Sequence, residues 1–254
     1  MAQSGPAMAL PAPQATYPSW QAESVRTTTE AYFTNLENGA KIETPFRLAF
    51  GLGGNWGLAP ISVPEGGKSG HHHLLVNRDL PLDFAKALPF SDQYIHFGKG
   101  QMETVLMLEP GSYTLRLLLA DDKHLPHFVY SKPLNITVTR KNADIDPQTL
   151  ITKGISLPNI KPNATLKPPF TVQFHVSGLK VAHLSQKQKD TGYFRLTVMP
   201  KNGGKPVEMN FTQGQTETRL APPSGAYRLK LDFMNNLNPG QKLADSVSTA
   251  VLVE

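Results

Sequence analysis

Short segments in which hydrophobic and polar residues alternate make up most of the chain after about residue 30. Tyr113, Leu115, Leu117 and Leu119 lie two residues apart, which is the period of a half-buried β-strand and not of a helix. Glycine, proline, asparagine and aspartate separate these segments and mark turns. In the first half of the chain the pattern predicts strands at 30–36, 45–52, 70–77, 93–97, 102–108, 112–120 and 133–140. In the second half it predicts strands at 154–160, 169–176, 191–199, 206–211, 215–220, 225–233 and 246–253, and only 78–92 could hold a short helix.

The two halves of the chain repeat each other. Residues 45–50 match 169–174, and 97–104 match 211–218. The offset between matching positions changes along the chain, so the loops differ in length while the strands keep their pattern. A period of more than about a hundred residues indicates duplicated domains, because solenoid repeats are far shorter. We therefore predict an all-β protein of two tandem immunoglobulin-like β-sandwich domains, with about seven strands each.

These patterns divide the chain into four parts. Residues 1–29 are rich in proline and alanine, lack an apolar period and are predicted to form a disordered N-terminal arm. Residues 30–140 form the first, histidine-rich sandwich, and 141–153 form a linker. Residues 154–254 form the second sandwich, which is a degenerate copy of the first.

Composition narrows the class of protein. The 254 residues are 39% hydrophobic and include 22 prolines and 20 glycines, which indicates a loop-rich globular protein. There is no cysteine, which excludes disulfides and thiolate metal ligands. No apolar run is long enough to span a bilayer, so we expect no membrane span.

The net charge of +5 lies mostly in the second half, where residues 141–254 carry fourteen basic and eight acidic side chains. The lysines are scattered over turns without the interleaved aromatics of a nucleic-acid surface, so we expect no nucleic-acid partner. A solvated basic face is the plain interpretation, and an acidic envelope protein that docks on the second domain is the alternative. The first residues contain no signal peptide and are similar to the processed start of an exported protein, which predicts a periplasmic location; a cytoplasmic protein with a disordered arm is the other reading.

Six of the eight histidines fall in the first domain, and the repeat replaces every one of them. They are His71, His72, His73, His96, His124 and His127. Their counterparts are Tyr193, Phe194, Arg195, Asn210, Asn238 and Gln241. Since the second copy of the fold does without these histidines, the fold itself does not require them. We interpret them as carrying a function.

Alternation along the strand 70–77 separates the three consecutive histidines. In the second copy Phe194 belongs to the apolar face of its strand, so the matching His72 is predicted to point into the core and to bond to backbone. His71 and His73 are predicted to share the opposite face. Residues two apart on a strand are roughly 6–7 Å apart, close enough for two imidazoles to bind one ion.

Two other segments supply the remaining candidates. His96 lies in a predicted strand, and His124 and His127 lie in the loop that follows the strand 112–120. Neutral imidazole suits copper, zinc, iron and nickel, and without thiolate the affinity order favours Cu(II) before Zn(II) or Ni(II). The predicted ligands are His71, His73, His96, His124 and His127. Asp121 is expected to orient a ligand imidazole, and Trp56, in a glycine-rich loop, is expected to cover the site.

Other functions remain open at this point. A metal-free binding module could use the histidines and Trp56 to recognise a polar ligand such as a glycan or peptide, and the histidines could also be structural. No nucleophile motif, split carboxylate pair or dinucleotide fingerprint is present, so we do not expect an enzyme.

With these residues identified, the first domain resembles a bacterial family of exported proteins, the domain of unknown function 4399 family. The resemblance covers about 30–140 and rests on six motifs, among them Gly-His-His-His-Leu-Leu at 70–75, His-Phe-Gly-Lys-Gly-Gln-x-Glu-Thr at 96–104 and Asp-x-x-His-x-Pro-His at 121–127. Residues 155–254 look like a degenerate second member. The resemblance implies a periplasmic location but no activity.

Overall fold

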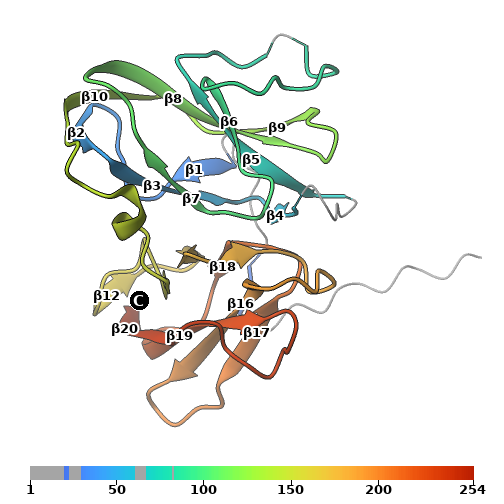
Figure 1. Cartoon of the computed structure of the whole chain (residues 1–254). Coiled ribbons are helices and arrows are strands. Elements are labelled where there is room, and N and C mark those ends of the chain that lie inside the picture. Colours follow the sequence, from blue (N-terminus) through green and yellow to red (C-terminus); the bar gives the residue numbers. More distant parts are fainter. Residues whose placement is uncertain (1–19, 23–29, 61–66, 82) are drawn as a thin grey trace, which may run out of the picture.

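The computed structural model describes residues 20–22, 30–60, 67–81 and 83–254, which form two β-domains stacked one above the other (Figure 1). Both domains consist of strands, and the regular helix among these residues is a single 3₁₀ turn, η1 (Pro147–Leu150), in the linker. The predicted class of two immunoglobulin-like β-sandwiches is confirmed. None of the described helical structure is long and apolar enough to cross a membrane.

The first domain packs a three-stranded sheet against a seven-stranded one. The small sheet has the order β1-β3-β7, with β1 (Ala31–Phe33), β3 (Phe46–Leu52) and β7 (Glu103–Leu106). The large sheet has the order β2-β10-β8-β5-β4, with β6 paired to β5 and β9 paired to β8. Its strands are β2 (Ala40–Thr44), β4 (Gly57–Leu58), β5 (Ser69–Val76), β6 (Tyr94–His96), β8 (Gly111–Ala120), β9 (Pro126–Tyr130) and β10 (Leu134–Lys141).

The second domain repeats this arrangement with smaller sheets. A six-stranded sheet has the order β12-β20-β19-β16-β15, with β17 paired to β16, and faces the small pairs β11-β14 and β13-β18. The strands are β11 (Gly154–Ser156), β12 (Ala164–Leu166), β13 (Phe170–Gln173), β14 (His175–Ser177), β15 (Lys180–Val181), β16 (Thr191–Pro200), β17 (Val207–Phe211), β18 (Glu217–Leu220), β19 (Gly225–Asn235) and β20 (Val247–Val253).

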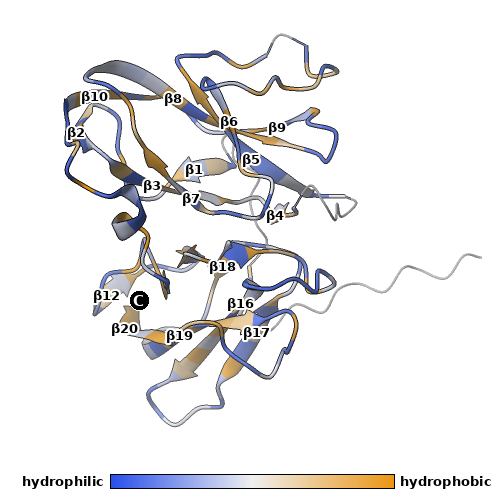
Figure 2. Ribbon diagram, viewed as in Figure 1, coloured by the Kyte–Doolittle hydropathy of each residue, from blue (hydrophilic) through white to orange (hydrophobic). Residues whose placement is uncertain are grey.

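Apolar residues from both sheets fill the space between them. Figure 2 shows hydrophobic and hydrophilic residues following one another closely along the ribbon of both domains. Single hydrogen bonds repeat between the domains as well. Asn35 and Asn159 each clamp the strand that follows them, through a carbonyl and an amide two residues apart. Tyr113 and Tyr227 each donate to the carbonyl four residues earlier. The duplication therefore extends to the hydrogen bonds of individual side chains.

The two domains meet through equivalent backbone segments. The Val181 amide donates to the Gly100 carbonyl, and the Leu58 amide donates to the Gly214 carbonyl, both at 2.9 Å. In the repeat, Gly100 corresponds to Gly214 and Leu58 corresponds to Val181. The two hydrogen bonds are therefore equivalent, and the contact between the domains has approximate two-fold symmetry. A Cβ on Gly100 would lie 2.1 Å from the Val181 carbonyl oxygen, so only glycine permits this approach.

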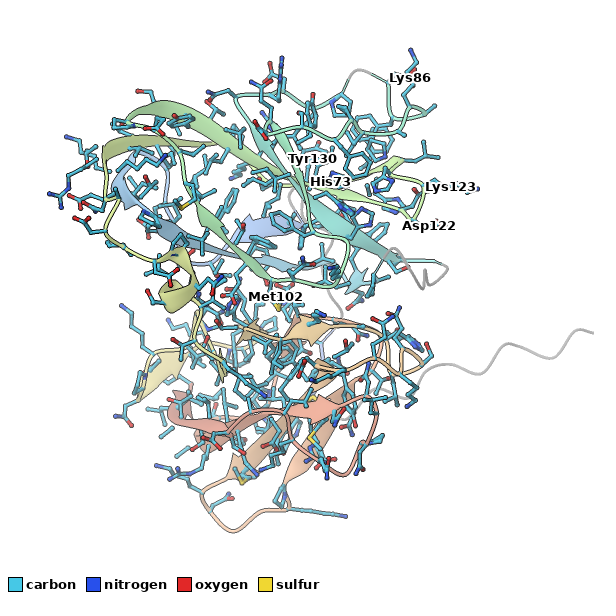
Figure 3. All side chains as sticks on the ribbon, in the orientation of Figure 1. His73, Lys86, Met102, Asp122, Lys123 and Tyr130 are labelled. Atoms are coloured by element: carbon cyan, nitrogen blue, oxygen red, sulfur yellow. The ribbon has the colours of Figure 1, made fainter. Side chains whose placement is uncertain are left out.

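Two repeated glutamates reinforce the same contact. Glu103 accepts a 2.8 Å hydrogen bond from the Gly178 amide of the second domain, and its counterpart Glu217 accepts one from the Gly54 amide of the first. Glu103 is also 3.3 Å from His175 Nε2 and pairs with Arg47 at 2.6 Å. Burial favours a higher pKa for this carboxyl, but the hydrogen bonds with His175 and Gly178 and the Arg47 charge hold the pKa at about 2. These glutamates join the domains. Figure 3 shows Met102, beside Glu103, at the boundary between the domains.

Several predictions about segments differ from the structure. Most of the predicted disordered arm lies outside the described residues, but Trp20 to Ala22 are held on the second domain, where the Ala22 amide donates to the Arg219 carbonyl. Trp20 packs edge-on against Tyr227 at 5.7 Å, so burial of an aromatic ring holds this part in place. Residues 78–92 contain turns and no helix, with residue 82 outside the described part. The loop expected at 121–127 continues into β9.

Candidate metal centre

Strand β5 sends its three consecutive histidines to opposite faces of the large sheet. Its odd-numbered residues face outward, where Leu75 forms a small apolar cluster with Leu118. His71 and His73 share this outer face and are 1% and 0% exposed. His72 points to the main core. The separation expected from strand alternation is therefore present in the structure.

Strand β6 supplies a third histidine to the outer face. It pairs antiparallel with β5, and the register places His96 directly opposite His73. Side chains directly opposite in an antiparallel pair point to the same face with their Cβ atoms about 5 Å apart. The ring centroids of these two histidines are 5.1 Å apart.

The turn after β8 supplies a fourth histidine. The Asp121 Oδ1 accepts hydrogen bonds of 2.8 Å from the amides of Lys123 and Leu125, which closes the turn around His124. His124 itself has a φ of 64°, a left-handed conformation that costs a non-glycine residue about 1–2 kcal/mol. Such strain is concentrated at functional sites. Asp121 was expected to orient an imidazole directly; the structure shows that it positions His124 through the backbone of the turn.

The four outer histidines converge on one point. His71, His73, His96 and His124 each offer one ring nitrogen, and these nitrogens lie within 4.8 Å of one another. The Nε2 atoms of His71 and His73 are 3.0 Å apart, in ring-to-ring hydrogen-bond contact. Metal–nitrogen bonds of about 2.0–2.1 Å require ligand atoms at such separations. This group of side chains could therefore hold a metal ion.

The surroundings of His71, His73 and His96 favour the neutral form of their imidazoles. Burial, reinforced by repulsion from neighbouring imidazolium charges, lowers the pKa of His71 to about 2 and that of His73 to about 3. The same two causes lower the pKa of His96. A neutral imidazole is the form that binds metal, so no proton needs to leave these rings at neutral pH.

The cluster also contains ring nitrogens without hydrogen-bond partners among the described residues. These are the Nδ1 atoms of His71 and His73 and the Nε2 atoms of His96 and His124, all inaccessible to solvent. A buried polar atom without a partner costs about 1–3 kcal/mol. The Nε2 atoms of His96 and His124 fit a site whose ligand supplies the missing interactions, whereas the Nδ1 atoms of His71 and His73 lie on the far side of rings whose Nε2 atoms face each other.

His127 lies apart from this group. In β9, Val129 packs in the main core and Tyr130 packs against the outer cluster, so alternation turns His127 inward, away from His71. Its ring packs against Trp56, with the centroids 4.9 Å apart. The sequence grouped His127 with the ligands because it assigned this segment to a loop. Trp56 accordingly covers His127, and its ring contact is not with any of the four converging histidines.

His72 differs from expectation in its bonding. Its ring is fully buried and meets Phe50 edge-on at 5.1 Å. The predicted hydrogen bond to backbone is wrong, since neither ring nitrogen has a partner among the residues that the structure describes. Burial lowers the pKa of this imidazole to about 3. The equivalent contact in the second domain is Phe174 against Phe194 at 5.3 Å.

The segment that covers the cluster is a feature that sequence reasoning missed. Residues 78–81 and 83–92 lie over the outer face, where Leu88 and Phe84 pack on the apolar cluster of Leu75 and Leu118. The Leu88 amide donates to the His124 carbonyl at 2.9 Å. Figure 3 shows His73 on β5, with Lys86 on the covering segment and Lys123 beyond it at the turn. The apolar residues of this segment, such as Phe84 and Leu88, are the sequence signal that could have indicated its packing on the sheet.

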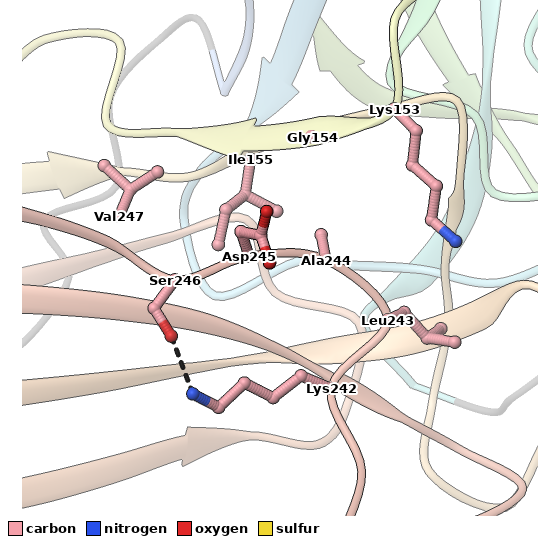
Figure 4. Close-up of a pocket in the computed structure, with 9 residues that line it drawn as sticks. All are labelled: Lys153, Gly154, Ile155, Lys242, Leu243, Ala244, Asp245, Ser246 and Val247. Carbon is pink, nitrogen blue, oxygen red and sulfur yellow. Dashed lines mark hydrogen bonds between the residues drawn. The ribbon is translucent and has the colours of Figure 1, made fainter.

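The second domain fills the matching place with charges. Arg195, at the position of His73, is 3.7 Å from Asp232, which Lys230 and Lys242 also approach within 3.5 and 3.2 Å. Burial favours a higher pKa for Asp232, but hydrogen bonds from Ser246 and Lys242 and the lysine charges hold it below its usual value. Lys242 and Ser246 also line a hollow of about 600 Å³ in this domain, where they bond each other at 2.7 Å (Figure 4). An ion-pair cluster around Asp232 occupies this place, and the described residues of the second domain contain no counterpart of the four-histidine cluster.

Comparison with known proteins adds the following. The family model described as Domain of unknown function (DUF4399) matches residues 48–139 and again 172–252. No curated protein matches the sequence. Fibronectin(III)-like modules of Clostridium thermocellum CbhA are 10% identical over 88% of this chain and 94% of that chain, with a TM-score of 0.28. Two fibronectin type III domains of chicken tenascin are 14% identical over 88% and 98%, with a TM-score of 0.25. Neither structure bears on the histidine cluster.

Proposed function

The chain belongs to the family described as Domain of unknown function (DUF4399), a description that names no activity, and from the cluster itself we propose that the protein binds a transition-metal ion through His71, His73, His96 and His124. The observation that carries this proposal is the convergence of four imidazoles from three separate segments. Two of them are almost completely buried. The second domain keeps the fold and lacks the cluster, which supports a binding role over a structural one.

Copper is the proposed ion, with zinc as the alternative. A site of four imidazole nitrogen ligands follows the general affinity order, in which Cu(II) exceeds both Ni(II) and Zn(II).

We also propose that the protein works in the periplasm, a location supported by the resemblance to exported bacterial proteins. The second domain then serves as a structural or docking module beside the metal-binding one. Cell fractionation of the full-length gene product tests the location. Recovery in the cytoplasmic fraction would contradict it.

Calorimetric titration of Cu(II) and Zn(II) into tag-free protein tests the function. The His71→Ala/His73→Ala double variant should lose the high-affinity uptake, and His96→Asn should weaken it while keeping the fold, because asparagine stands at this place in the second domain. His127→Ala is the matched control and should bind like the wild type. Uptake by the double variant equal to that of the wild type would refute the assignment. A protein that takes up neither ion would favour the metal-free alternative.

A further inference from the structure

We propose that Phe90 closes the open side of the four-histidine cluster and denies the bound ion any exchangeable outside ligand. This inference rests on the metal-binding function proposed above. A closed site of this kind suits retention of an ion, as in storage or delivery. Catalytic metal sites differ, because they keep one coordination position open.

Burial shows which side of the cluster is open. His71 and His73 lie at its base on β5 and are almost inaccessible, whereas His96 and His124 are half-buried and form the side toward solvent. The ring of Phe90 contacts both of the latter. Its centroid is 5.3 Å from that of His96 and 4.7 Å from that of His124, with interplanar angles of 85° and 70°.

The backbone holds Phe90 in this place from both sides. Two residues before it, the Leu88 amide donates to the carbonyl of His124 at 2.9 Å. One residue after it, the Ser91 carbonyl accepts from the Tyr94 amide at 3.0 Å, next to β6. The ring is thus tied to both segments whose histidines it covers. The large exposed fraction of Phe90, 65%, is explained if the ring shields the site instead of filling a core.

An apolar ring at this position has a definite chemical effect. A small anion or a water molecule that approached the ion from solvent would have to displace the ring or pass it. The phenyl group offers neither a ligand atom nor a hydrogen bond to an entering molecule. Exchange of outside ligands should therefore be slow and unfavourable in the wild type.

Azide is the probe for this inference, because its complex with Cu(II) gives a charge-transfer absorption band. Wild type, Phe90→Ala and Phe128→Ala are loaded with Cu(II) and titrated with azide, and release of copper to a chelator is timed. Phe128 is the matched control, since it is 67% exposed and stacks on Phe84, outside the cluster. We expect Phe90→Ala to bind azide and to release copper at least about tenfold more readily than the other two, a factor equal to one decade in the equilibrium constant.

Each outcome distinguishes the two proposals. Copper uptake with equal azide binding in all three proteins overturns the role of Phe90 and leaves the metal site intact. No azide binding even by Phe90→Ala has the same consequence, and so does equal behaviour of Phe90→Ala and Phe128→Ala. Failure of the wild type to take up copper overturns the proposed function, and the inference falls with it.

Discussion

Replacement of His72 by phenylalanine should stabilise the first domain. In the wild type both ring nitrogens are buried without partners, at a cost of about 1–3 kcal/mol each. Phenylalanine removes both penalties, and the second domain already accommodates it as Phe194 against Phe174. Overpacking of the slightly larger ring costs about 1 kcal/mol or more. Two penalties of at least about 1 kcal/mol each, against an overpacking cost of about 1 kcal/mol, leave an expected gain of at least about 1 kcal/mol in the free energy of unfolding at pH 7.5.

The gain should grow as the solution becomes acidic. Burial lowers the pKa of His72 to about 3 in the folded protein, while an unfolded histidine titrates near its ordinary value of about 6.5. Below that value the unfolded wild type binds a proton that the folded protein does not, so wild-type stability falls as the pH falls toward 3. The difference between variant and wild type should widen by up to about 1.4 kcal/mol per pH unit in this window.

Urea unfolding at pH 7.5, 6.0 and 5.0 measures the effect. Trp56 lies in the first domain, and a Trp20→Phe background removes the tryptophan that packs on the second domain, so fluorescence follows the domain of interest. Copper uptake should be unchanged, because His72 points away from the four ligands. A variant less stable than the wild type, or a difference that does not change with pH, would refute this reasoning.

Three further predictions follow from the site and the domain contact. Copper should stay bound in equilibrium dialysis at pH 5, because the low pKa values of His71 and His73 keep protons from competing; complete release there would contradict it. Asp121→Ala should weaken copper binding about tenfold in calorimetry, because the turn that positions His124 loses two hydrogen bonds. Gly100→Ala should lower the free energy of unfolding by about 2 kcal/mol or more in urea titrations, since its Cβ would clash with Val181. Gly203→Ala, with nearly the same φ of 82° but open space around it, is the control and should cost less.

The repeated pattern made most of the fold predictable. Every strand predicted in the first half has a counterpart, and the alternation in β5 and β16 placed the core face correctly, with Phe194 fully buried. The pairing of His73 with His96 also agrees with the repeat, since Arg195 pairs with Asn210 in the same way. The strand period and the duplication can both be recognised from the sequence without knowledge of tertiary contacts.

The errors concern features that depend on distant partners. The face of His127 could not be read from the sequence, because β9 forms only by pairing with β8, and the register shifts between Leu118 and Ala120. The role of Phe90 was hidden for a similar reason. Its segment has no strand period and becomes a cover through the bond from Leu88 to His124. Tertiary contacts and not local propensity decide these positions.

The two-fold contact through Gly100 and Gly214 has a consequence for assembly. An interface in which each half offers the same surface is the arrangement of a homodimer, here fused into one polypeptide. Tethering makes the association independent of protein concentration, and it leaves that surface with no room for another molecule. The second half lacks the four-histidine cluster, so if the proposed site binds an ion, the pair should hold one ion where two identical halves would hold two.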